Sequence, residues 1–490
     1  MAPLEATTFN RYGPNAHATD YPPVFLRGQL PEAFGSFRWR DDLYIVGQSH
    51  VPSFVGPGMT VLHVDGAGVF DGRFCTVPAD FTLRCEDQAN LVERLSKELR
   101  GAAALYVADE RAGELLILPD QLSAALLFTY SGPHLQAAST SMRALVRTLR
   151  ATGVSLTRSC DFFVELLASE AGGYTQSSYD EIQAAPLHSH LAFGAKGMSY
   201  RSYSGVAPLS QPGISYKEQL HRAAEEITEN ASVAATMSGT LTTHLTAGAD
   251  SRLVGAALTA AGVADKFVFF CGANAVTREQ DIAQLIAGHM GWTMTQHPGT
   301  ATATMVPGTV QSRQATLEAT EGIKTTGPTE GQLRSRGLVL TGYNGEALKS
   351  FYSGRVEALT PGAFDAATFL RAVWPKNLID PEAGLVQPEA VERIRSTVQA
   401  KIDDARDSGV PVETIGDHLY LKARNRYFAW HSAMEGSRYR PQFTPLYSPA
   451  MVRLAMSMPL EYRTSGRITF DLFRLLAPRT LEVPLGLVQR

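Results

Sequence analysis

Short apolar runs separated by Gly, Asp and Pro fill the first part of the chain, up to about residue 205. The runs at 42–46, 104–108 and 114–118 predict strands, because branched and aromatic apolar residues suit a pleated, half-buried backbone. The polar stretch at 109–113 has the composition of a hairpin turn. The stretches at 139–151 and 161–171 predict helices on the faces of such sheets. This part is therefore expected to be rich in β-structure.

From residue 216 onward the pattern changes to alternating helices and strands. Helices are predicted at 217–236, 251–261 and 278–290, and strands at 241–245, 267–271, 292–296 and 338–341. Nearly continuous apolar strands that alternate with helices indicate a sheet covered on both faces. This part therefore predicts a parallel α/β sheet, followed from about residue 365 to 490 by a mostly helical region.

A boundary is predicted at the Pro- and Gly-rich stretch 205–213, which has the composition of a linker. The chain has 490 residues, which is too long for one ordinary hydrophobic core. We therefore expect an α/β protein of two domains, at 1–205 and 206–490.

Composition narrows the class of protein. Hydrophobic residues make up 44% and charged residues 19%, which is typical of a soluble globular chain. A net charge of -4 without basic runs gives no reason to expect nucleic acid as a partner. No apolar stretch reaches the roughly 18 residues of a membrane span, so no membrane partner is expected. The first residues lack a secretory signal and the four cysteines are scattered, so reduced thiols and a cytoplasmic location are expected.

The first candidate site follows the strand predicted at 241–245. There Thr246-Ala-Gly-Ala-Asp250-Ser251 leads from that strand into a helix. The unpaired N–H groups of a first helical turn attract anions, and small residues let phosphate oxygens approach the backbone. Hydroxyl groups of Thr246 and Ser251 can donate to phosphate, and Asp250 fits such a site if Mg²⁺ accompanies the phosphates. The alternative interpretation is an ordinary strand–helix turn with a capped helix.

A second strand end has similar chemistry. The run 338–341 ends in Thr341-Gly-Tyr-Asn-Gly-Glu346, a polar turn that contains glycine and a carboxylate. Ligands of open parallel sheets bind at the carboxyl ends of the strands. The two turns together could therefore hold Mg²⁺ and ATP, whereas the alternative for the second is an exposed turn with an incidental glutamate.

These motifs resemble the asparagine synthetase superfamily over nearly the whole chain. The family's Ser-Gly-Gly-x-Asp-Ser loop matches residues 246–251, and its Ser-Gly-Glu-Gly-Ser-Asp loop aligns with residues 341–346. Glu346 then takes the place of the metal-binding aspartate, and Tyr343 replaces a glutamate, as in the β-lactam synthetase branch. The resemblance implies a degenerate Ntn-hydrolase-like αββα sandwich at 1–205. It implies a PP-loop ATP pyrophosphatase domain, with a parallel sheet and a helical C-terminal part, at 206–490.

The N-terminal domain of that family hydrolyses glutamine with an N-terminal cysteine. Residue 2 of this chain is Ala, and a methyl group cannot replace a nucleophile, so we expect no glutaminase activity. The amine must then come from another source. That expectation resembles the β-lactam synthetases and the lasso-peptide cyclases, which have lost the cysteine.

The resemblance implies a mechanism in which ATP and Mg²⁺ activate a carboxylate as an acyl-adenylate, pyrophosphate leaves, and an amine then attacks. Asp250 and Glu346 are expected to hold the metal. Tyr343 is expected to accept the proton of the amine, with Glu382 as its carboxylate partner by spacing alone. Arg467 is the candidate substitute for the family's lysine, although a surface charge on a helix is an equal alternative. The residues expected to bind ATP or pyrophosphate are Leu245, Thr246, Ala247, Gly248, Ala249, Asp250, Ser251, Arg252, Phe270 and Gly342.

The leading hypothesis is a carbon–nitrogen ligase for peptide or natural-product biosynthesis, such as antibiotic biosynthesis. Its substrate would be a small molecule or peptide that carries a carboxylate and an amine, and intramolecular cyclisation is one form of the reaction. One alternative is an ammonia-dependent enzyme similar to asparagine synthetase. A different alternative is an inactive scaffold or partner protein. A homodimer and a separate biosynthetic partner protein both stay open.

Overall fold

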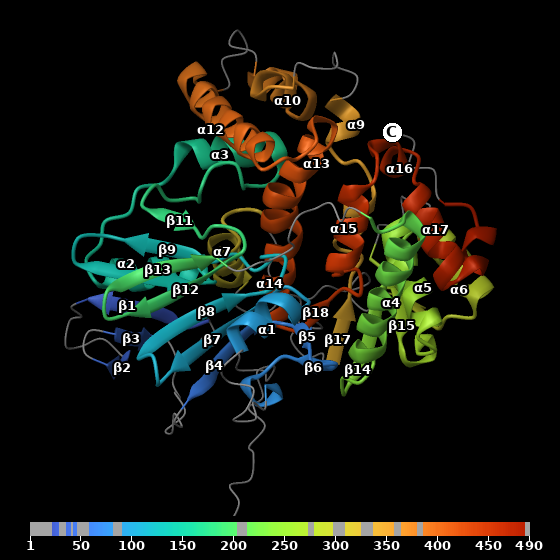
Figure 1. Cartoon of the computed structure of the whole chain (residues 1–490), viewed down its shortest axis with the longest axis horizontal. Coiled ribbons are helices and arrows are strands. Elements are labelled where there is room, and N and C mark those ends of the chain that lie inside the picture. The colour runs from blue at the N-terminus through green and yellow to red at the C-terminus, as the bar shows by residue number, and fades with distance from the viewer. Residues whose placement is uncertain are drawn as a thin grey trace, which may run out of the picture.

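The computed structural model describes residues 22–28, 36–40, 43–46, 58–81, 91–202, 213–272, 279–296, 309–324, 337–356, 364–379 and 386–485. Within them the chain is a mixed α/β protein with several sheets. Figure 1 shows two antiparallel sheets on the left and a parallel sheet with its helices on the right. A column of helices stands between these two halves.

The N-terminal half contains two antiparallel sheets that pack face to face. One has the order β11 (Ile182–Ala184), β9 (Phe128–Ser131), β10 (Leu135–Ser139), β1 (Val24–Gly28), β3 (Leu43–Val46) and β2 (Ser36–Arg40). The other has the order β13 (Gly197–Ser202), β12 (Ser189–Gly194), β8 (Glu114–Pro119), β7 (Ala103–Asp109) and β4 (Met59–Gly66). Side chains alternate along the strands, so Phe25 lies in the core between the sheets while Val24 and Leu26 face outward.

Helices cover the outer faces of both sheets. The apolar side of α1 (Leu91–Glu98) packs on the sheet of β7, and that of α2 (Met142–Ala151) packs on the sheet of β1. Helix α3 (Cys160–Ser169) contributes Phe162 to the second of these clusters. A small hairpin of β5 (Gly68–Phe70) and β6 (Arg73–Cys75) adjoins α1. The layers are thus helix, sheet, sheet and helix.

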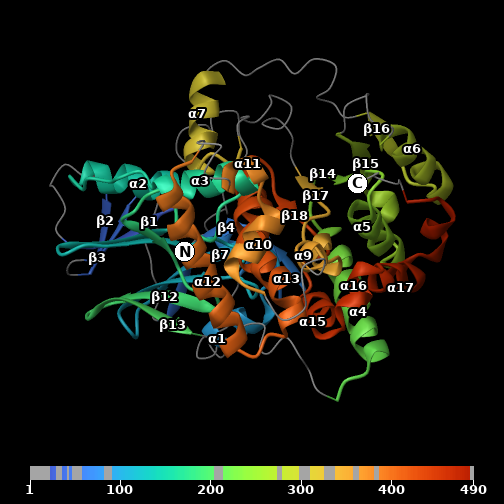
Figure 2. The same cartoon turned by 90° about the horizontal axis from the view of Figure 1, so that it is seen from above.

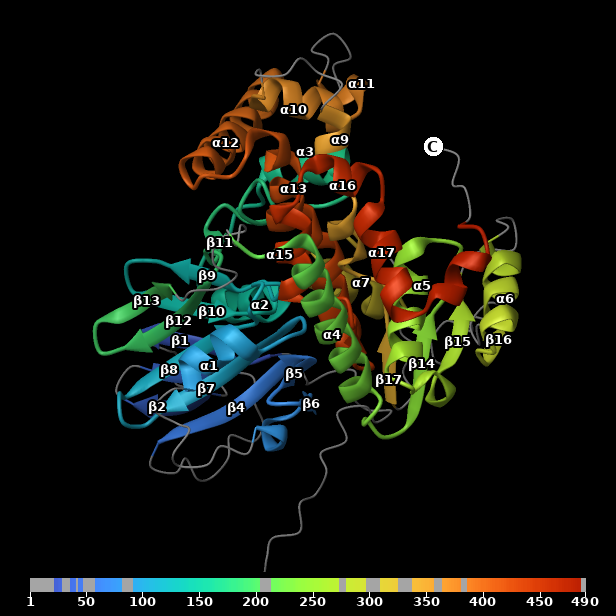
Figure 3. The ribbon, with the colours of Figure 1, turned by 45° about the vertical axis from the view of Figure 1, so that its right-hand side comes forward.

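The C-terminal half is built on a parallel sheet with the order β16 (Met294–Gln296), β15 (Val268–Cys271), β14 (Thr240–His244), β17 (Gly337–Leu340) and β18 (Gln442–Phe443). Figure 3 shows α4 (Tyr216–Ala234), α5 (Ala249–Ala260) and α6 (Glu279–Met290) beside these strands. The chain passes outward from β14 to β16 and then returns to β17 on the opposite side of β14. The direction of winding therefore changes between β14 and β17.

The remaining helices connect the two halves. They are α7 (Thr309–Ala319), α9 (Ser353–Val356), α10 (Ala366–Val373), α11 (Lys376–Ile379), α12 (Pro388–Asp407), α13 (Ile415–Tyr420), the π-helix η7 (Leu421–Trp430), α14 (His431–Ser437), α15 (Pro449–Ser457), α16 (Leu460–Thr464) and α17 (Arg467–Leu476). Figure 2 shows the antiparallel strands on one side and α5 and α6 on the other, and in Figure 1 α10 and α12 lie above the antiparallel sheets. Trp430, Ala433, Met434 and Tyr447 pack into the core between the two N-terminal sheets. The halves therefore share one core.

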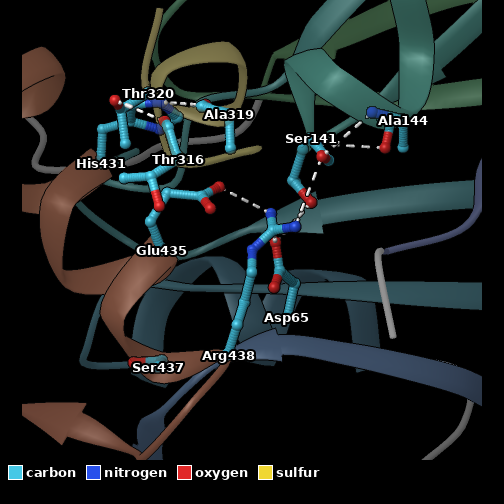
Figure 4. Close-up of polar contacts among 12 residues, drawn as sticks. Asp65, Ser141, Ala144, Thr316, Ala319, Thr320, His431, Glu435, Ser437 and Arg438 are labelled. Atoms are coloured by element: carbon cyan, nitrogen blue, oxygen red, sulfur yellow. Dashed lines mark hydrogen bonds and ion pairs between the residues drawn. The ribbon is translucent and has the colours of Figure 1, made fainter. Parts of the chain in front are cut away.

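A buried group of charged side chains also joins the halves; we call Asp65, Glu435 and Arg438 the interdomain cluster (Figure 4). Arg438 of the segment after α14 lies 2.8 Å from Glu435 Oε1 and 3.9 Å from Asp65 Oδ2 of β4. Its guanidinium also donates to Ser141 Oγ, 3.4 Å away, which itself accepts from Ala144 N at the start of α2. One guanidinium thus contacts groups from both halves.

The strands and helices that the sequence predicted lie within three residues of their observed bounds, whereas most strands of the N-terminal half, among them β4, β9, β10 and β12, had no predicted range. Residues 139–141 differ, because Ser139 ends β10 and the side chain of Ser141 caps α2 at Met142. Strand β18 and the π-helix η7 were not predicted. Of the predicted linker at 205–213, only Gly213 is among the described residues. Over the described part of the chain, no helix has both the length and the apolar character needed to cross a membrane.

Candidate functional site

The two predicted turns meet where the winding of the parallel sheet changes. The first turn joins β14 to α5, and the second follows β17 and leads into the short 3₁₀-helix η4 (Gly345–Leu348). A Cβ atom at Gly345 would lie 2.6 Å from Asp250 Cγ, and one at Gly342 would lie 3.0 Å from Ser251 N. Only glycine therefore lets the second turn pack this closely against the first turn of α5. The expected proximity of the two strand ends is confirmed.

Within the first turn, two hydroxyl groups hold the backbone. The N–H of Thr246 donates to Ser251 Oγ at 2.9 Å, and the two hydroxyl oxygens are 3.0 Å apart. The N–H of Gly248 lies 3.3 Å from Thr246 Oγ1. Gly248 is the N-cap residue of α5 and has no side chain with which to cap the helix. The positive end of the helix dipole therefore faces the turn without a capping side chain.

The two predicted metal ligands lie beside each other, but their partners differ. Lys349 Nζ donates to Asp250 Oδ2 at 2.7 Å. Glu346 Oε2 is buried and has no hydrogen-bond partner among the described residues. Burial and the neighbouring charge of Asp250 raise the pKa of Glu346 from its ordinary 4.5 to about 7. A buried carboxylate oxygen without a partner is rare and needs an explanation.

This pair of carboxylates fits a divalent cation that takes most of its ligands from elsewhere. Mg²⁺ is usually held by one or two protein carboxylates, with water and phosphate oxygens completing its octahedron. Among the residues that the structure describes, no group of three or more His, Cys, Asp or Glu side chains is arranged to hold a metal ion. Asp250 and Glu346 are therefore the residues of this site that could hold a divalent cation.

Tyr343 and Asn344 continue the second turn away from Asp250. Burial, followed by the charge of Glu346, raises the pKa of Tyr343, so that its hydroxyl stays protonated at neutral pH. Asn344 has a left-handed backbone with φ 73°, and its amide donates to the carbonyl of Leu446 at 2.8 Å. Asn425 of η7 donates to Asn344 Oδ1 at 3.1 Å. Side chains from the helical region thus fix the shape of this turn.

Three other predicted nucleotide-binding residues lie around the first turn. The N–H of Leu245 donates to the carbonyl of Phe270 at 2.8 Å, which places the ends of β14 and β15 side by side. The Phe270 ring packs against His244, with ring centroids 4.3 Å apart. Arg252 is fully buried and donates to the carbonyls of Val483 and Pro484, at 2.8 Å and 2.7 Å. Its described contacts tie the C-terminal segment to α5.

The described contacts of Arg467, another predicted catalytic residue, lie outside the two turns. The Arg467 guanidinium lies over the rings of Tyr462 and Tyr216, at 4.3 Å and 5.3 Å, and 3.7 Å from Asp471. Glu382 and Ala2 lie outside the described residues. The stacked rings give Arg467 a packing role, and its proposed chemical role stays a prediction.

Sequence reasoning overlooked Lys349, the cation that contacts Asp250. The sequence did contain a signal for this residue, because the charged Lys349 directly follows the apolar residues Ala347 and Leu348. Both of these are buried in the structure. Its position three residues after Glu346 places it next to the same carboxylates. Asn425 was also overlooked, and no local motif marks it, since its partner lies 81 residues away.

Comparisons with known proteins give little further information. No protein-family model and no curated protein matches the chain. The chain is similar to a solved structure described as the allosteric regulatory enzyme of purine biosynthesis, with 12% identity, a TM-score of 0.16, and 60% of this chain and 49% of that one covered. It is also similar to the glutamine phosphoribosylpyrophosphate amidotransferase from B. subtilis complexed with ADP and GMP, with 11% identity, a TM-score of 0.20, and 69% and 66% covered. The chain thus spans about half of the first structure and about two thirds of the second. The TM-scores are too low to indicate a shared fold.

Proposed function

We propose that this chain is an ATP-dependent ligase that activates a substrate carboxylate and couples it to an amine. The observation that supports the proposal is the meeting of two strand ends at the change of winding, where Glu346 Oε2 is buried without a partner among the described residues. Open α/β sheets bind ligands at such a point. The C-terminal half is accordingly proposed to be an ATP pyrophosphatase domain of the PP-loop type. The layered N-terminal half is proposed to be a degenerate Ntn-hydrolase-like domain.

ATP is a substrate of the proposed reaction. An oxygen of the substrate carboxylate attacks the α-phosphorus, the bond to the bridging β-phosphate oxygen breaks, and pyrophosphate leaves. The amine nitrogen then attacks the activated carbonyl carbon, AMP leaves with the electrons of the carbon–oxygen bond, and the amine proton passes to a base. The work of the protein in such a reaction is chiefly positioning and charge stabilisation.

The residues of the two turns divide this work between them. The uncapped N–H groups of α5 and the hydroxyls of Thr246 and Ser251 would bind the phosphate oxygens. Asp250 and Glu346 would hold Mg²⁺, which when bound offsets phosphate charge. Lys349 would then leave Asp250 and remain close by as a second positive charge. Because its hydroxyl stays protonated, Tyr343 would need a neighbouring carboxylate other than the metal ligands to take the amine proton onward. Glu382, the partner expected from spacing, lies outside the described residues.

One observation favours a second candidate, an inactive scaffold or partner protein. Lys349 Nζ donates to Asp250 Oδ2 at 2.7 Å, so a side chain of the protein can itself supply the positive charge beside this carboxylate. Such a protein would bind neither Mg²⁺ nor ATP. Nucleotide binding therefore separates the two candidates before any substrate is known.

The first experiment measures binding of a non-hydrolysable ATP analogue to the full chain, with and without Mg²⁺. The ligase proposal predicts saturable binding that requires Mg²⁺ and is lost in Asp250→Ala. Asp265→Ala, which removes an exposed aspartate from the short 3₁₀-helix η3 (Ala264–Lys266) before β15, serves as the matched control. If neither wild type nor control binds the analogue, the ligase proposal fails and the scaffold remains.

The second experiment supplies ATP, Mg²⁺ and pools of peptides and small molecules that carry a carboxylate and an amine, and measures release of AMP and pyrophosphate. Parallel reactions with ammonium or with glutamine identify the source of the amine. Product mass then distinguishes the forms of the reaction. A cyclised product is lighter than its single substrate by one water, whereas an intermolecular product is heavier than either substrate.

A further inference from the structure

A cavity of about 350 Å³ adjoins the second predicted turn and lies between the N-terminal half and the helical region. Leu122, Leu187 and His188 form its wall on the N-terminal side. The opposite wall comes from the π-helix η7, from α15 and from the segment 408–411. Asn344 of the second turn also lines this cavity, so one wall adjoins the candidate site.

The polar part of the lining is rich in nitrogen. His188, His418, Lys422 and Arg426 all line the cavity, and none of its described lining residues is an Asp or a Glu. Arg426 is held in place, since its Nε donates to the carbonyl of Ser123 at 2.6 Å. The Nδ1 atom of His188 and the Nε2 atom of His418 are buried without a hydrogen-bond partner among the described residues. Unsatisfied buried nitrogens of this kind are costly unless a ligand pairs with them.

These groups lie close enough to disfavour one another's positive charge. Burial, with the charges of Arg426 and Lys422, lowers the pKa of His188 to about 4, and burial with Lys422 lowers that of His418 to about 3. Burial also lowers the pKa of Lys422. The charges of Lys401 and Arg426 lower it further, whereas the charge of Asp404 raises it. The cavity thus brings positive charges and hydrogen-bond donors together, and none of its described lining residues supplies a carboxylate to pair with them.

The π-helix explains why three polar side chains share this wall. A π-helix closes its hydrogen bonds over five residues, so side chains four and five positions apart lie on one face. Lys422, Arg426 and Trp430 are spaced by four, and Leu421 precedes Asn425 and Arg426 by four and five. Most π-helical segments are short and occur at functional sites, whereas this one extends over ten residues.

The rest of the lining is apolar. Leu122, Leu187, Leu421, Trp430, Val452 and Met456 contribute hydrocarbon surface to the same cavity. Ligand sites commonly combine a mostly apolar wall with a few convergent polar groups. A small inorganic anion would pair with the nitrogens but would leave this hydrocarbon surface without a partner.

We propose that the cavity binds a small organic carboxylate with an apolar body, whose charged end contacts Lys422 and the Nε2 atom of His418. The apolar body packs against the leucine, valine and methionine side chains of the opposite wall. The bound molecule lies next to Asn425, whose amide donates to Asn344 of the second turn. The proposal stands independently of the ligase activity, because it concerns binding alone.

The test titrates the full chain with straight-chain carboxylates from butanoate to decanoate, each paired with the neutral primary amide of the same length. Calorimetry is expected to show one saturable site with a preferred chain length, because the cavity is of limited size. The matched amides and inorganic phosphate are expected to bind about tenfold more weakly or worse, since a hydrogen bond to a charged group contributes about 1.5–3 kcal/mol.

Three variants separate charge from shape. Lys422→Met is expected to weaken carboxylate binding about tenfold or more, whereas Lys422→Arg keeps the charge and stays within a few-fold of wild type. Met456→Trp fills the apolar part and is expected to abolish binding of the longer carboxylates while leaving every nitrogen in place. Thermal unfolding verifies that each variant folds. If Lys422→Met does not fold, Met456→Trp still tests the proposal.

Two results would overturn the proposal. The first is the absence of saturable binding by every carboxylate in the series. The second is carboxylate binding that is equal to that of the amides, or that neither Lys422→Met nor Met456→Trp reduces.

Discussion

Glu435 of the interdomain cluster and Glu346 of the candidate site are both buried carboxylates with a raised pKa, and burial is the main cause in each. Their surroundings differ. Glu435 has a guanidinium 2.8 Å away that lowers its pKa in part, whereas the nearest charge that acts strongly on Glu346 is the carboxylate of Asp250. The nearby cation, Lys349, contacts Asp250 instead.

We interpret this difference as one between a charged group that stabilises the fold and a charged group that is proposed to bind a ligand. In the interdomain cluster, the positive charge belongs to the chain and joins its N-terminal and C-terminal halves. At the candidate site, Glu346 lies beside a second carboxylate, and the half-exposed Lys349 contacts Asp250 instead. Lys349 and Arg424 lower the pKa of Glu346, but burial and the charge of Asp250 raise it by more. A polar group that is buried without a partner reduces stability. Such a group beside a change of winding is expected where the site serves to bind a ligand. The predictions that follow test this contrast.

The largest effect is expected for Arg438→Met. The substitution keeps the side-chain stem but leaves Asp65 and Glu435 buried without their cation. Breaking a buried ion pair from one side costs about 3–5 kcal/mol, and we expect a loss of this size in the free energy of unfolding by urea. The exposed Arg395→Met, whose partner Glu392 is also exposed, is the control. A loss below about 1 kcal/mol would show that the cluster is not structural.

A smaller but still clear loss is expected for Gly345→Ala. The added methyl group would lie 2.6 Å from three atoms of Asp250, so the second turn must move away from α5. Overpacking of this kind costs about 1–3 kcal/mol, and Mg²⁺-dependent binding of the ATP analogue should also weaken. Gly288→Ala in α6 is the control, because its Cβ would meet no atom within 4 Å. Equal stability of both variants contradicts the close packing of the turns.

Unlike the two substitutions above, Glu346→Gln should increase the free energy of unfolding. The ordinary pKa of 4.5 rises to about 7 on folding, so the unfolded chain releases this proton first and wild-type stability falls as the pH rises between these values. With EDTA present, the amide should stabilise the protein by about 1 kcal/mol at about pH 8 and by almost nothing at about pH 5. Glu435→Gln should destabilise at both pH values, because Arg438 loses a partner. Urea unfolding of both variants measures the contrast, which disappears if the two carboxylates are equivalent.

The smallest change in stability is expected for Lys349→Met. Its side chain is 36% exposed, and pairs of this kind contribute about 0–1 kcal/mol. The informative measurement is the Mg²⁺ concentration needed to raise the unfolding temperature. We expect this concentration to fall, because Mg²⁺ no longer competes with the ammonium group for Asp250, while Lys349→Arg should stay near wild type. An unchanged or higher concentration would mean that Lys349 does not occupy the metal position.

The sequence was most informative where function depends on local geometry. Small residues at 247–249 and the glycines at 342 and 345 made both turns recognisable, and parallel strands then placed the turns side by side. The sequence could not reveal Asn425 or the π-helix, because each depends on a partner or a backbone register set by distant packing. The orientation of Arg252 was equally hidden, since its carbonyl partners lie more than two hundred residues along the chain.

The shared core has a consequence for how this protein can be divided. Trp430, Ala433, Met434 and Tyr447 fill the space between the two N-terminal sheets, and Tyr447 also bonds to Asp120 and to the N–H of Leu122. A fragment that ends near residue 205 would expose to water the apolar surface that these side chains cover, and it would be prone to aggregate. The same dependence limits recombination, because an N-terminal half exchanged with that of another protein would have to accept these four side chains as well.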